Sequence, residues 1–323
     1  MKFSTLSVLL LTAVSTLAAP LVERATGRTT APSGTLVVSK SAKSGQYSTI
    51  QAAINKLSTS STAAQSIFIE SGVYDEQVYI PARKAALTIY GYTTDTSSYV
   101  HNTVNITHGI GADTAGTDDL SGTVRNWAEN TKVYNINIIN TRGQGSQAIA
   151  ISASAGNQGY YGCQFWGFQD TVMAQTGAQL YAKSLIVGAT DFIFGQHATA
   201  WFSQVDLRVL KASKGYVTAN GRPSSTDPSF YVFDRCTIAA AAGNSVPTGA
   251  YYLGRPCAGW SVWGSSDPRT AHATFEEYNN SGAGSTGTRA SFSKKTTASV
   301  GTSTVLGQGY AKFGWVDTSY LPA

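Results

Sequence analysis

The sequence is poor in charged residues, cysteine, histidine and methionine. Of its 323 residues only 13% are charged, and three are cysteine, four histidine and two methionine. Three cysteines cannot all pair, so no disulfide framework is expected, and Cys163 and Cys236 lie in apolar strand patterns typical of small buried residues. The four histidines are scattered without the spacing of metal ligands, so we expect neither a metal nor a cofactor.

Long apolar runs are also missing, and none is long enough to cross a membrane. Near the start, an apolar run from Leu6 to Leu17 is followed by Ala18-Ala19-Pro20, which is the pattern of a secretory signal peptide. We therefore expect residues 1–19 to be removed and the protein to be secreted. Residues 20–33 are interpreted as a linker or short pro-segment and 34–323 as a single domain. A buried N-terminal helix is the less favoured alternative.

The residues that are abundant narrow the class of protein. Glycine, serine and threonine are frequent and aromatic residues reach 11%, a composition that favours an all-β secreted architecture over a helical bundle. The net charge of +5 is spread along the chain, which suits an anionic polymer as partner. No basic cluster with interleaved aromatic residues occurs, so nucleic acid is not expected, and a monomer is the default. Asn105 and Asn279 each begin a motif for N-glycosylation.

Polar residues recur at a nearly constant interval between Gln147 and Gly195. Gln147 precedes Gln169 by 22 residues, and Asp170 precedes Asp191 by 21. Short apolar alternations with strand character recur at about the same interval, at 148–151, 160–165, 180–187 and 200–205. A strand-rich repeat with a period of about 20 residues predicts a solenoid of stacked coils, that is, a parallel β-helix.

Other elements are expected along the same solenoid. A short amphipathic helix at 48–57, capped by Ser48 or Thr49, is expected to cover the open first coil. The Gly/Thr/Asp-rich excursion at 101–123 is expected to rim a groove. Further strands are predicted at 34–40, 66–70, 76–80, 86–92, 124–128, 132–139, 230–233 and 236–241, with a turn at 72–76 and a second helix at 274–279.

Stacking of the coils would bring the polar residues together. With neighbouring strands about 4.8 Å apart, Asp170 and Asp191 would face each other beside Gln147 and Gln169. Two carboxyl groups this close cannot both ionise easily, so one is expected to act as an acid and the other as a nucleophile or base. The amide N–H groups of the glutamines would suit an oxyanion that forms on an attacked carbonyl. This combination describes acyl transfer from an ester, although retaining glycosidases also pair carboxyl groups at this spacing and an isolated aspartate often only closes a turn.

Five short motifs occur in order along the chain: Gly72-Val73-Tyr74-Asp75-Glu76, Gln147-Ala148-Ile149-Ala150, Gly167-Phe168-Gln169-Asp170-Thr171, Asp191-Phe192-Ile193-Phe194-Gly195 and Leu253-Gly254-Arg255-Pro256. Together, and in this order, they resemble the signature motifs of the pectin methylesterase family, in its fungal form. The resemblance covers residues 34 to 320. It implies a right-handed parallel β-helix that acts, without a metal, on methyl-esterified pectin.

The resemblance also implies a role for each site residue. Asp191 matches the nucleophile that attacks the C6 methyl ester, and Asp170 matches the acid that protonates methanol and then the base that activates water. Gln169 matches an oxyanion donor, with Gln147 beside it. Arg255 matches the residue that orients the nucleophilic aspartate.

Two aromatic residues resemble groove residues that contact sugar faces, Phe168 and Phe194. For Phe168, ordinary packing between coils is an equal alternative.

The sequence departs from the family after Pro256. Cys257 stands where the family has a sugar-stacking tryptophan, and a stretch of about one coil is missing before the Trp/Gly-rich tail. A real deletion or a misplaced splice junction in the coding sequence would account for the gap. The second explanation is favoured, because loss of a coil should expose apolar edges.

Two other functions remain as alternatives. A catalytically impaired pectin-binding homologue would follow if the missing coil removed activity. A β-helical pectin glycosidase or lyase is less favoured, because Asp118-Asp119 is the only adjacent pair of aspartates and lacks the accompanying His and Arg-x-Lys element.

Overall fold

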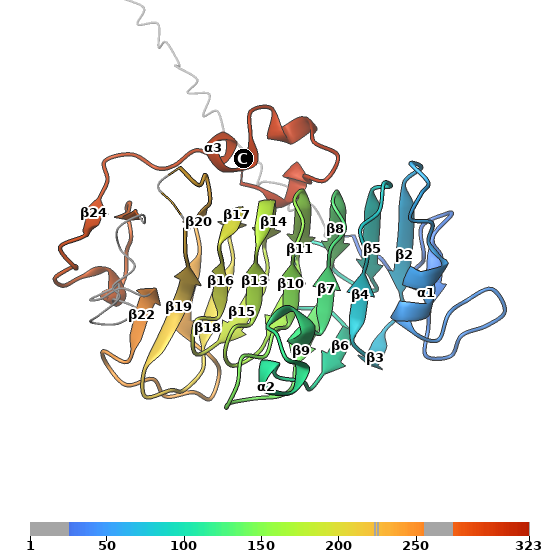
Figure 1. Cartoon of the computed structure of the whole chain (residues 1–323), viewed down its shortest axis with the longest axis horizontal. Coiled ribbons are helices and arrows are strands. Elements are labelled where there is room, and N and C mark those ends of the chain that lie inside the picture. Colours follow the sequence, from blue (N-terminus) through green and yellow to red (C-terminus); the bar gives the residue numbers. More distant parts are fainter. Residues whose placement is uncertain (1–25, 223, 225, 255–273, 323) are drawn as a thin grey trace, which may run out of the picture.

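The computed structural model describes residues 26–222, 224, 226–254 and 274–322. Most of these residues wind into a column of stacked coils (Figure 1). Three sheets extend along the long axis of the column, and their parallel strands run across it. This confirms the predicted all-β parallel β-helix.

We call the sheets that contain β1, β4 and β3 the first, second and third sheet. The first sheet contains β1 (Leu36–Val38), β2 (Gln65–Ile69), β5 (Leu87–Gly91), β8 (Thr131–Tyr134), β11 (Gln158–Tyr161), β14 (Thr176–Ala182), β17 (His197–Ser203) and β20 (Phe230–Asp234). The second sheet contains β4 (Val78–Ile80), β7 (Val124–Asn126), β10 (Ile151–Ala153), β13 (Val172–Ala174), β16 (Ile193–Gly195), β19 (Gly215–Asn220) and β22 (Tyr251–Gly254). The third sheet contains β3 (Gly72–Asp75), β6 (Val104–His108), β9 (Asn137–Asn140), β12 (Gln164–Trp166), β15 (Leu185–Gly188), β18 (Asp206–Val209) and β21 (Thr237–Ala240).

The 21-residue interval sets the register between coils. Along the first sheet, Tyr160 pairs with Tyr181, and Tyr181 pairs with Phe202. Their rings are fully buried and stack with centroids 4.9 and 4.7 Å apart. The repeat therefore builds an aromatic column inside the β-helix, and that column holds adjacent coils in one register.

The predicted N-terminal helix is confirmed as α1 (Ile50–Lys56), which lies at the β1–β4 end of the column (Figure 1). Its apolar residues Ile50, Ala53 and Ile54 are buried in the first coils. The Thr49 side chain caps the helix by accepting a hydrogen bond from the Ala52 N–H at 3.2 Å. The helix closes the apolar interior at this end, as expected for a solenoid cap.

Glu76 also caps α1, and its loss is expected to weaken this end of the fold. Its two carboxylate oxygens accept hydrogen bonds from the N–H groups of Ile50 and Gln51 at 2.8 and 2.9 Å. Glu76→Ala leaves both donors without this partner and removes a negative charge from a helix N-terminus, so the free energy of unfolding should fall by about 1–2 kcal/mol. Chemical denaturation measures the effect, with Glu129→Ala as a control at an exposed glutamate. An equal loss in both variants would contradict the capping role.

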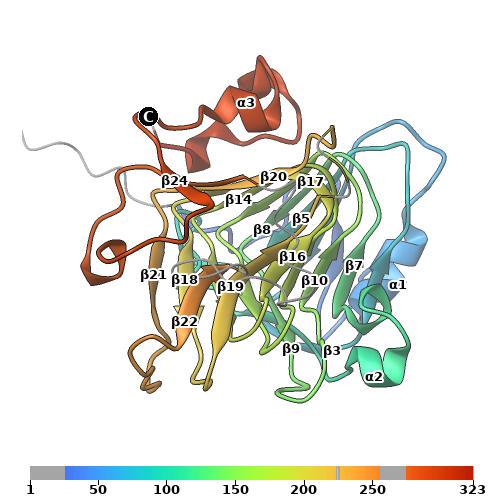
Figure 2. The same cartoon turned by 60° about the vertical axis from the view of Figure 1, so that its left-hand side comes forward.

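The C-terminal part of the chain covers the outer face of the first sheet. The helix α3 (Thr302–Leu306) lies over β14 and β17, as Figure 2 shows. Farther along, the Tyr161 hydroxyl donates to the Trp315 carbonyl at 2.7 Å and accepts from the Asp317 N–H at 2.9 Å. The short 3₁₀ turns η3 (Tyr310–Lys312) and η4 (Thr318–Tyr320) follow α3, and a further turn, η2 (Ala283–Ser285), lies earlier in the chain. The first sheet is therefore closed to a polymer ligand where this tail covers it.

Several predicted boundaries were wrong because corners of the β-helix break long apolar stretches. Predicted strands at 132–139, 160–165 and 180–187 are each two strands, separated at Asn135, Gly162 and Lys183, which have positive φ values of 53°, 58° and 48°. A single residue in the left-handed region turns the chain sharply between the first and third sheets. Lysine has no preference for such a turn, which is why the apolar pattern hid this corner.

Other element predictions were also wrong. The predicted turn at 72–76 is the strand β3, which pairs with β6 inside the predicted excursion at 101–123. That excursion also contains α2 (Ala112–Ala115) and η1 (Asp119–Ser121). At 148–151, only Ile151 belongs to a strand. The predicted helix at 274–279 is the strand β23 (Phe275–Glu277), which pairs in parallel with β24 (Ser293–Lys295). Hydrogen bonding to another strand decided the two cases in which local sequence favoured a turn or a helix.

Candidate active site

The structure brings Asp170 and Asp191 to equivalent positions of adjacent coils. Each lies two residues before a strand of the second sheet, β13 for Asp170 and β16 for Asp191. The preceding residues Gln169 and Thr190 form a parallel bridge, and the Asp170 N–H donates to the Thr190 carbonyl at 3.1 Å. Strands of one sheet are about 4.8 Å apart, so the two carboxyl groups project from neighbouring steps of the same ladder.

Burial of the carboxyl group distinguishes these two aspartates from ordinary turn residues. Asp170 and Asp191 have φ values of 65° and 52°, in the left-handed region, and are only 7% and 6% exposed. Burial of an ionisable carboxyl group is costly, and a left-handed conformation adds strain for a residue with a side chain. Two adjacent coils repeat the same costly arrangement, which is typical of a catalytic site.

A bulge in the backbone aligns Gln147 with Gln169. The N–H groups of Ala150 and Ile151 both donate to the Thr171 carbonyl, at 2.9 and 3.3 Å. Two residues of one coil therefore oppose one of the next, and the extra residue turns the 21-residue repeat into an interval of 22. The Ala148 N–H then donates to the Gln169 carbonyl at 3.1 Å. This register confirms that Gln147 and Gln169 lie at matching steps, and both side chains are half-buried.

The segment that carries Gln147 is also held by the excursion between β6 and β7. The Ala112 N–H donates to the Gln147 carbonyl at 2.8 Å, and the Ile149 N–H donates to the Ser121 hydroxyl at 3.3 Å. The excursion thus borders the glutamine side of the site, in agreement with its predicted place at a rim.

Asn140, which the sequence did not single out, ties these segments together. It is the last residue of β9 and is 4% exposed. Its Nδ2 atom lies 2.9, 3.0 and 3.1 Å from the carbonyl oxygens of Ile110, Ser121 and Ile149. A buried amide at this junction fixes both the excursion and the segment after Gln147. Only its long-range contacts reveal it, since an asparagine at a strand end is common in sequence.

Phe194 faces outward from the second sheet beside the aspartates. Its neighbours Ile193 and Gly195 are buried, whereas Phe194 is half-buried, and it pairs with Met173 on the adjacent strand. Phe168 is also half-buried, and its carbonyl accepts hydrogen bonds from Ala189 and Thr190 at 2.7 and 3.2 Å. Phe194 thus lies on the outer face of the second sheet, next to the aspartates. The role of Phe168 stays a prediction.

Arg255 and Cys257 lie outside the described residues, as does the position of the predicted gap. The strand β22 ends at Gly254, immediately before them in sequence. The role of Arg255 and the missing coil therefore stay predictions.

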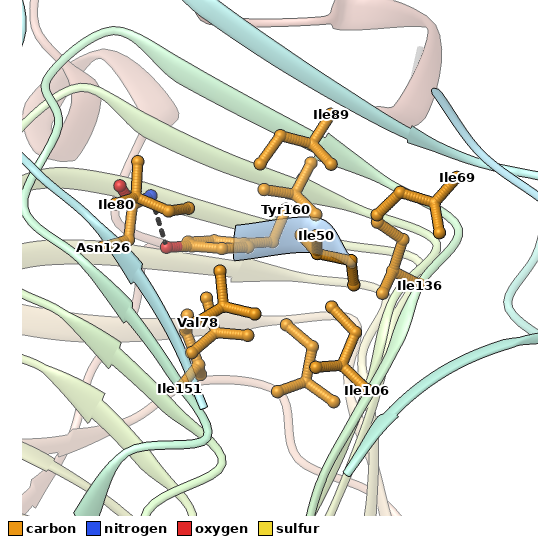
Figure 3. Close-up of a pocket in the computed structure, with 13 residues that line it drawn as sticks. Ile50, Ile69, Val78, Ile80, Ile89, Ile106, Asn126, Ile136, Ile151 and Tyr160 are labelled. Carbon is orange, nitrogen blue, oxygen red and sulfur yellow. Dashed lines mark hydrogen bonds between the residues drawn. The ribbon is translucent and has the colours of Figure 1, made fainter. Parts of the chain in front are cut away.

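The interior of the β-helix offers no alternative site at its first coils. Figure 3 shows a cavity lined by apolar side chains such as Ile89, Ile106 and Ile136, with a volume of about 10 Å³. The Asn126 amide that reaches it donates to the Tyr160 hydroxyl at 3.2 Å. The cavity holds at most one water molecule, so no sugar or ester could bind there.

The described residues contain no group of three or more His, Cys, Asp or Glu side chains that could hold a metal ion. Cys163 is fully buried and Cys236 half-buried, and burial raises the pKa of each thiol to about 12. Both thiols therefore stay protonated and are poor nucleophiles. Within this part of the chain, the two buried aspartates are the candidates for chemistry.

Comparison with known proteins gives consistent matches. The family model described as Pectinesterase matches residues 35–258. A pectinesterase of Aspergillus aculeatus is 52% identical, with coverage of 92% of this chain and 95% of that protein. A pectinesterase of Aspergillus niger is 50% identical, with coverage of 92% and 95%. The crystal structure of a pectin methylesterase from Aspergillus niger, in deglycosylated form, superposes with a TM-score of 0.82 at 39% identity, and covers 91% of this chain and all of that one.

Proposed function

The chain belongs to the pectinesterase family and is a carboxylic ester hydrolase of that type, and from this premise we propose how its residues hydrolyse the methyl esters of pectin. The substrate is the C6 methyl ester of homogalacturonan, and the products are methanol and a free carboxylate. The observation that supports the assignment is the pair of buried aspartates at equivalent positions of adjacent coils. One member acts as a nucleophile and the other as a proton donor and acceptor.

In the first step, the Asp191 carboxylate attacks the C6 carbonyl carbon and a tetrahedral intermediate forms. The negative charge that develops on the carbonyl oxygen accepts hydrogen bonds from the side-chain amides of Gln169 and Gln147. Asp170, in its protonated form, gives its proton to the methoxyl oxygen as the C–O bond breaks. Methanol leaves, and the galacturonyl group remains bound to Asp191 as an acid anhydride.

In the second step, the Asp170 carboxylate takes a proton from water, and the resulting hydroxide attacks the galacturonyl carbonyl. The same two amides stabilise the second oxyanion. The bond to Asp191 breaks, the product leaves as a carboxylic acid that ionises in water, and Asp170 is again protonated. Each proton and oxygen is accounted for without a cofactor.

Arg255, from its place in the Leu-Gly-Arg-Pro motif, is proposed to orient Asp191 through hydrogen bonds and to favour its ionised form. Phe194 is proposed to contact a sugar face beside the scissile ester, because its side chain lies on the outer surface of β16. Phe168 is proposed to share this role.

Secretion, a single catalytic domain from 34 to 323 and a monomeric state are also proposed. Residues 1–19 have the composition of a signal peptide. No helix among the described residues is long and apolar enough to span a membrane. Gel filtration and N-terminal sequencing of the secreted protein test these three points.

The assigned roles are tested by methanol release from highly methylated pectin. The variants Asp191→Asn and Asp170→Asn should fold and bind pectin but lose release. The impaired pectin-binding alternative predicts binding without methanol from the wild type as well, and no observation favours it. A glycosidase or lyase would shorten the polymer, whereas the relatives that match most of this chain are pectinesterases.

Asn140 is expected to support catalysis by fixing the segment after Gln147. Asn140→Ala should lower kcat about 10- to 100-fold with little change in KM, because a small displacement of an oxyanion donor weakens transition-state binding. Asn137→Ala is the matched control, since Asn137 is 6% exposed on the same strand and its amide donates to Asn105 instead.

A double-variant cycle separates this role from a general loss of stability. If Asn140 acts through Gln147, adding Asn140→Ala to Gln147→Ala should cost little further activity. Fully multiplicative losses in kcat would contradict the proposed coupling.

A further inference from the structure

Trp127 is a large aromatic residue held in an exposed position on the sheet that carries the catalytic aspartates. It directly follows β7 of the second sheet and is 43% exposed. Its neighbours Asn126 and Ala128 are fully buried, so the indole projects from the outer face. The indole N–H donates to Asp119 Oδ1 at 3.1 Å, which fixes the orientation of the ring.

Asp119 is itself fixed by several hydrogen bonds. Arg125 donates to Asp119 Oδ2 through Nε at 3.0 Å and Nη2 at 2.6 Å, and the Ser152 hydroxyl donates to Oδ1 at 2.6 Å. Burial acts to raise the pKa of Asp119, but the hydrogen bonds from Arg125, Ser152 and Trp127 outweigh it and hold the pKa below its ordinary value. The carboxylate therefore stays ionised, and remains an acceptor for the indole, over the working pH range of most enzymes.

A second aromatic residue stands beside this cluster. The Arg125 guanidinium lies over the Tyr79 ring at 4.9 Å from its centroid, and Tyr79 is itself exposed. Tyr79 pairs directly with Arg125 across β4 and β7. The two rings, together with Asp119 and Arg125, form what we call the Trp127 platform.

The platform lies on the same outer face of the second sheet as Phe194. On the outer face of the second sheet, successive strands pair Tyr79 with Arg125, Arg125 with Ser152, Ser152 with Met173 and Met173 with Phe194. These four steps span about 19 Å at the usual strand spacing. A pectin chain whose ester reaches Asp191 can therefore extend over several sugar residues toward Trp127.

We propose that the Trp127 platform binds a distal part of the same pectin chain, through the face of a sugar residue several units from the ester that is cleaved. The proposal rests on the proposed function, since it requires pectin to lie on the second sheet. A ring that is already oriented loses little conformational entropy when a sugar stacks on it, which makes an immobilised tryptophan an effective anchor.

Charge in the platform favours methyl-esterified sugar residues over free galacturonate. The only two charges that we place in it, Asp119 and Arg125, are paired with each other. The pair leaves no net positive charge to attract a carboxylate, whereas the aromatic faces suit an uncharged ester. The platform would thus direct the enzyme to densely methylated stretches.

The test is Trp127→Ala, assayed on substrates of two lengths. On long, highly methylated pectin, KM should rise about three- to tenfold with kcat unchanged, because a stacking contact is lost far from the reacting atoms. On methylated oligomers too short to reach the platform, kcat/KM should be unchanged. Trp127→Phe retains an aromatic face and should lie between wild type and Trp127→Ala.

Trp166→Ala is the matched control. Trp166 is 37% exposed, and its indole N–H donates to Gln164 at 2.8 Å, but it lies on β12 of the third sheet. This variant should behave as wild type on both substrates. An unchanged KM of Trp127→Ala on long pectin, or an equal loss on short oligomers, would overturn the proposal.

Binding without turnover separates this inference from the catalytic assignment. In an Asp191→Asn background, affinity for long methylated pectin should fall when Trp127→Ala is added, and should not fall with Trp166→Ala. If Asp191→Asn still released methanol, the nucleophile assignment would be wrong. The comparison of affinities would still show whether the Trp127 platform binds pectin.

Discussion

Asp191→Asn is expected to reduce methanol release from methylated pectin by more than about 10³-fold. Asparagine has nearly the same shape as aspartate, so the left-handed corner at this position should be retained. The uncharged amide cannot attack an ester carbonyl, and no anhydride can form. Initial rates of methanol release at saturating substrate measure the loss, and binding of methylated pectin should persist.

A control at another aspartate shows whether the loss is specific. Asp75→Asn changes an exposed aspartate on β3 of the third sheet and should leave the rate unchanged. If Asp191→Asn kept the wild-type rate, or if Asp75→Asn lost activity equally, the nucleophile would have to be sought elsewhere.

Asp170→Asn is expected to lower turnover of methyl esters by about 10²- to 10⁴-fold, the usual contribution of a general acid and base. Methanol is a poor leaving group that needs a proton, and the asparagine amide cannot supply one. The second step should suffer too, because water would lose its general base. The variant therefore affects both halves of the reaction, while the nucleophile Asp191 remains in place.

Substrates with different leaving groups distinguish this role from a loss of structure. An ester of a much more acidic alcohol needs no protonation, so Asp170→Asn should release a rapid burst of alcohol, one per enzyme, and then turn over slowly. Asp191→Asn should show no burst with the same substrate. If Asp170→Asn and Asp191→Asn both fold but neither shows a burst, the two aspartates do not have separate roles.

The arrangement of the site could be predicted from sequence because the repeat interval is long-range information in itself. An interval of 21 residues between Asp170 and Asp191 equals one coil, and one coil brings equivalent residues to adjacent strands. The interval of 22 between the glutamines also indicated neighbours. A bulge at Ala150 and Ile151 absorbs the one extra residue, and only the hydrogen bonds to Thr171 reveal this bulge.

Other features depend on contacts that no local pattern contains. The corner at Lys183 has a residue without any turn preference, and its left-handed conformation is imposed by the coils above and below it. The strand β23 has a helical pattern in sequence, but it pairs with β24. Asp119 meets Ser152, 33 residues away, and this contact joins the excursion to the sheet beside Trp127. Such tertiary hydrogen bonds override local propensity.

The most direct test of the central claim is to follow methanol, acid and chain length together as this protein acts on highly methylated pectin. We expect methanol and new carboxyl groups to appear in equal amounts, with the length of the polymer unchanged. A folded, pectin-binding protein that releases no methanol, or one that shortens the polymer without demethylating it, would contradict the account.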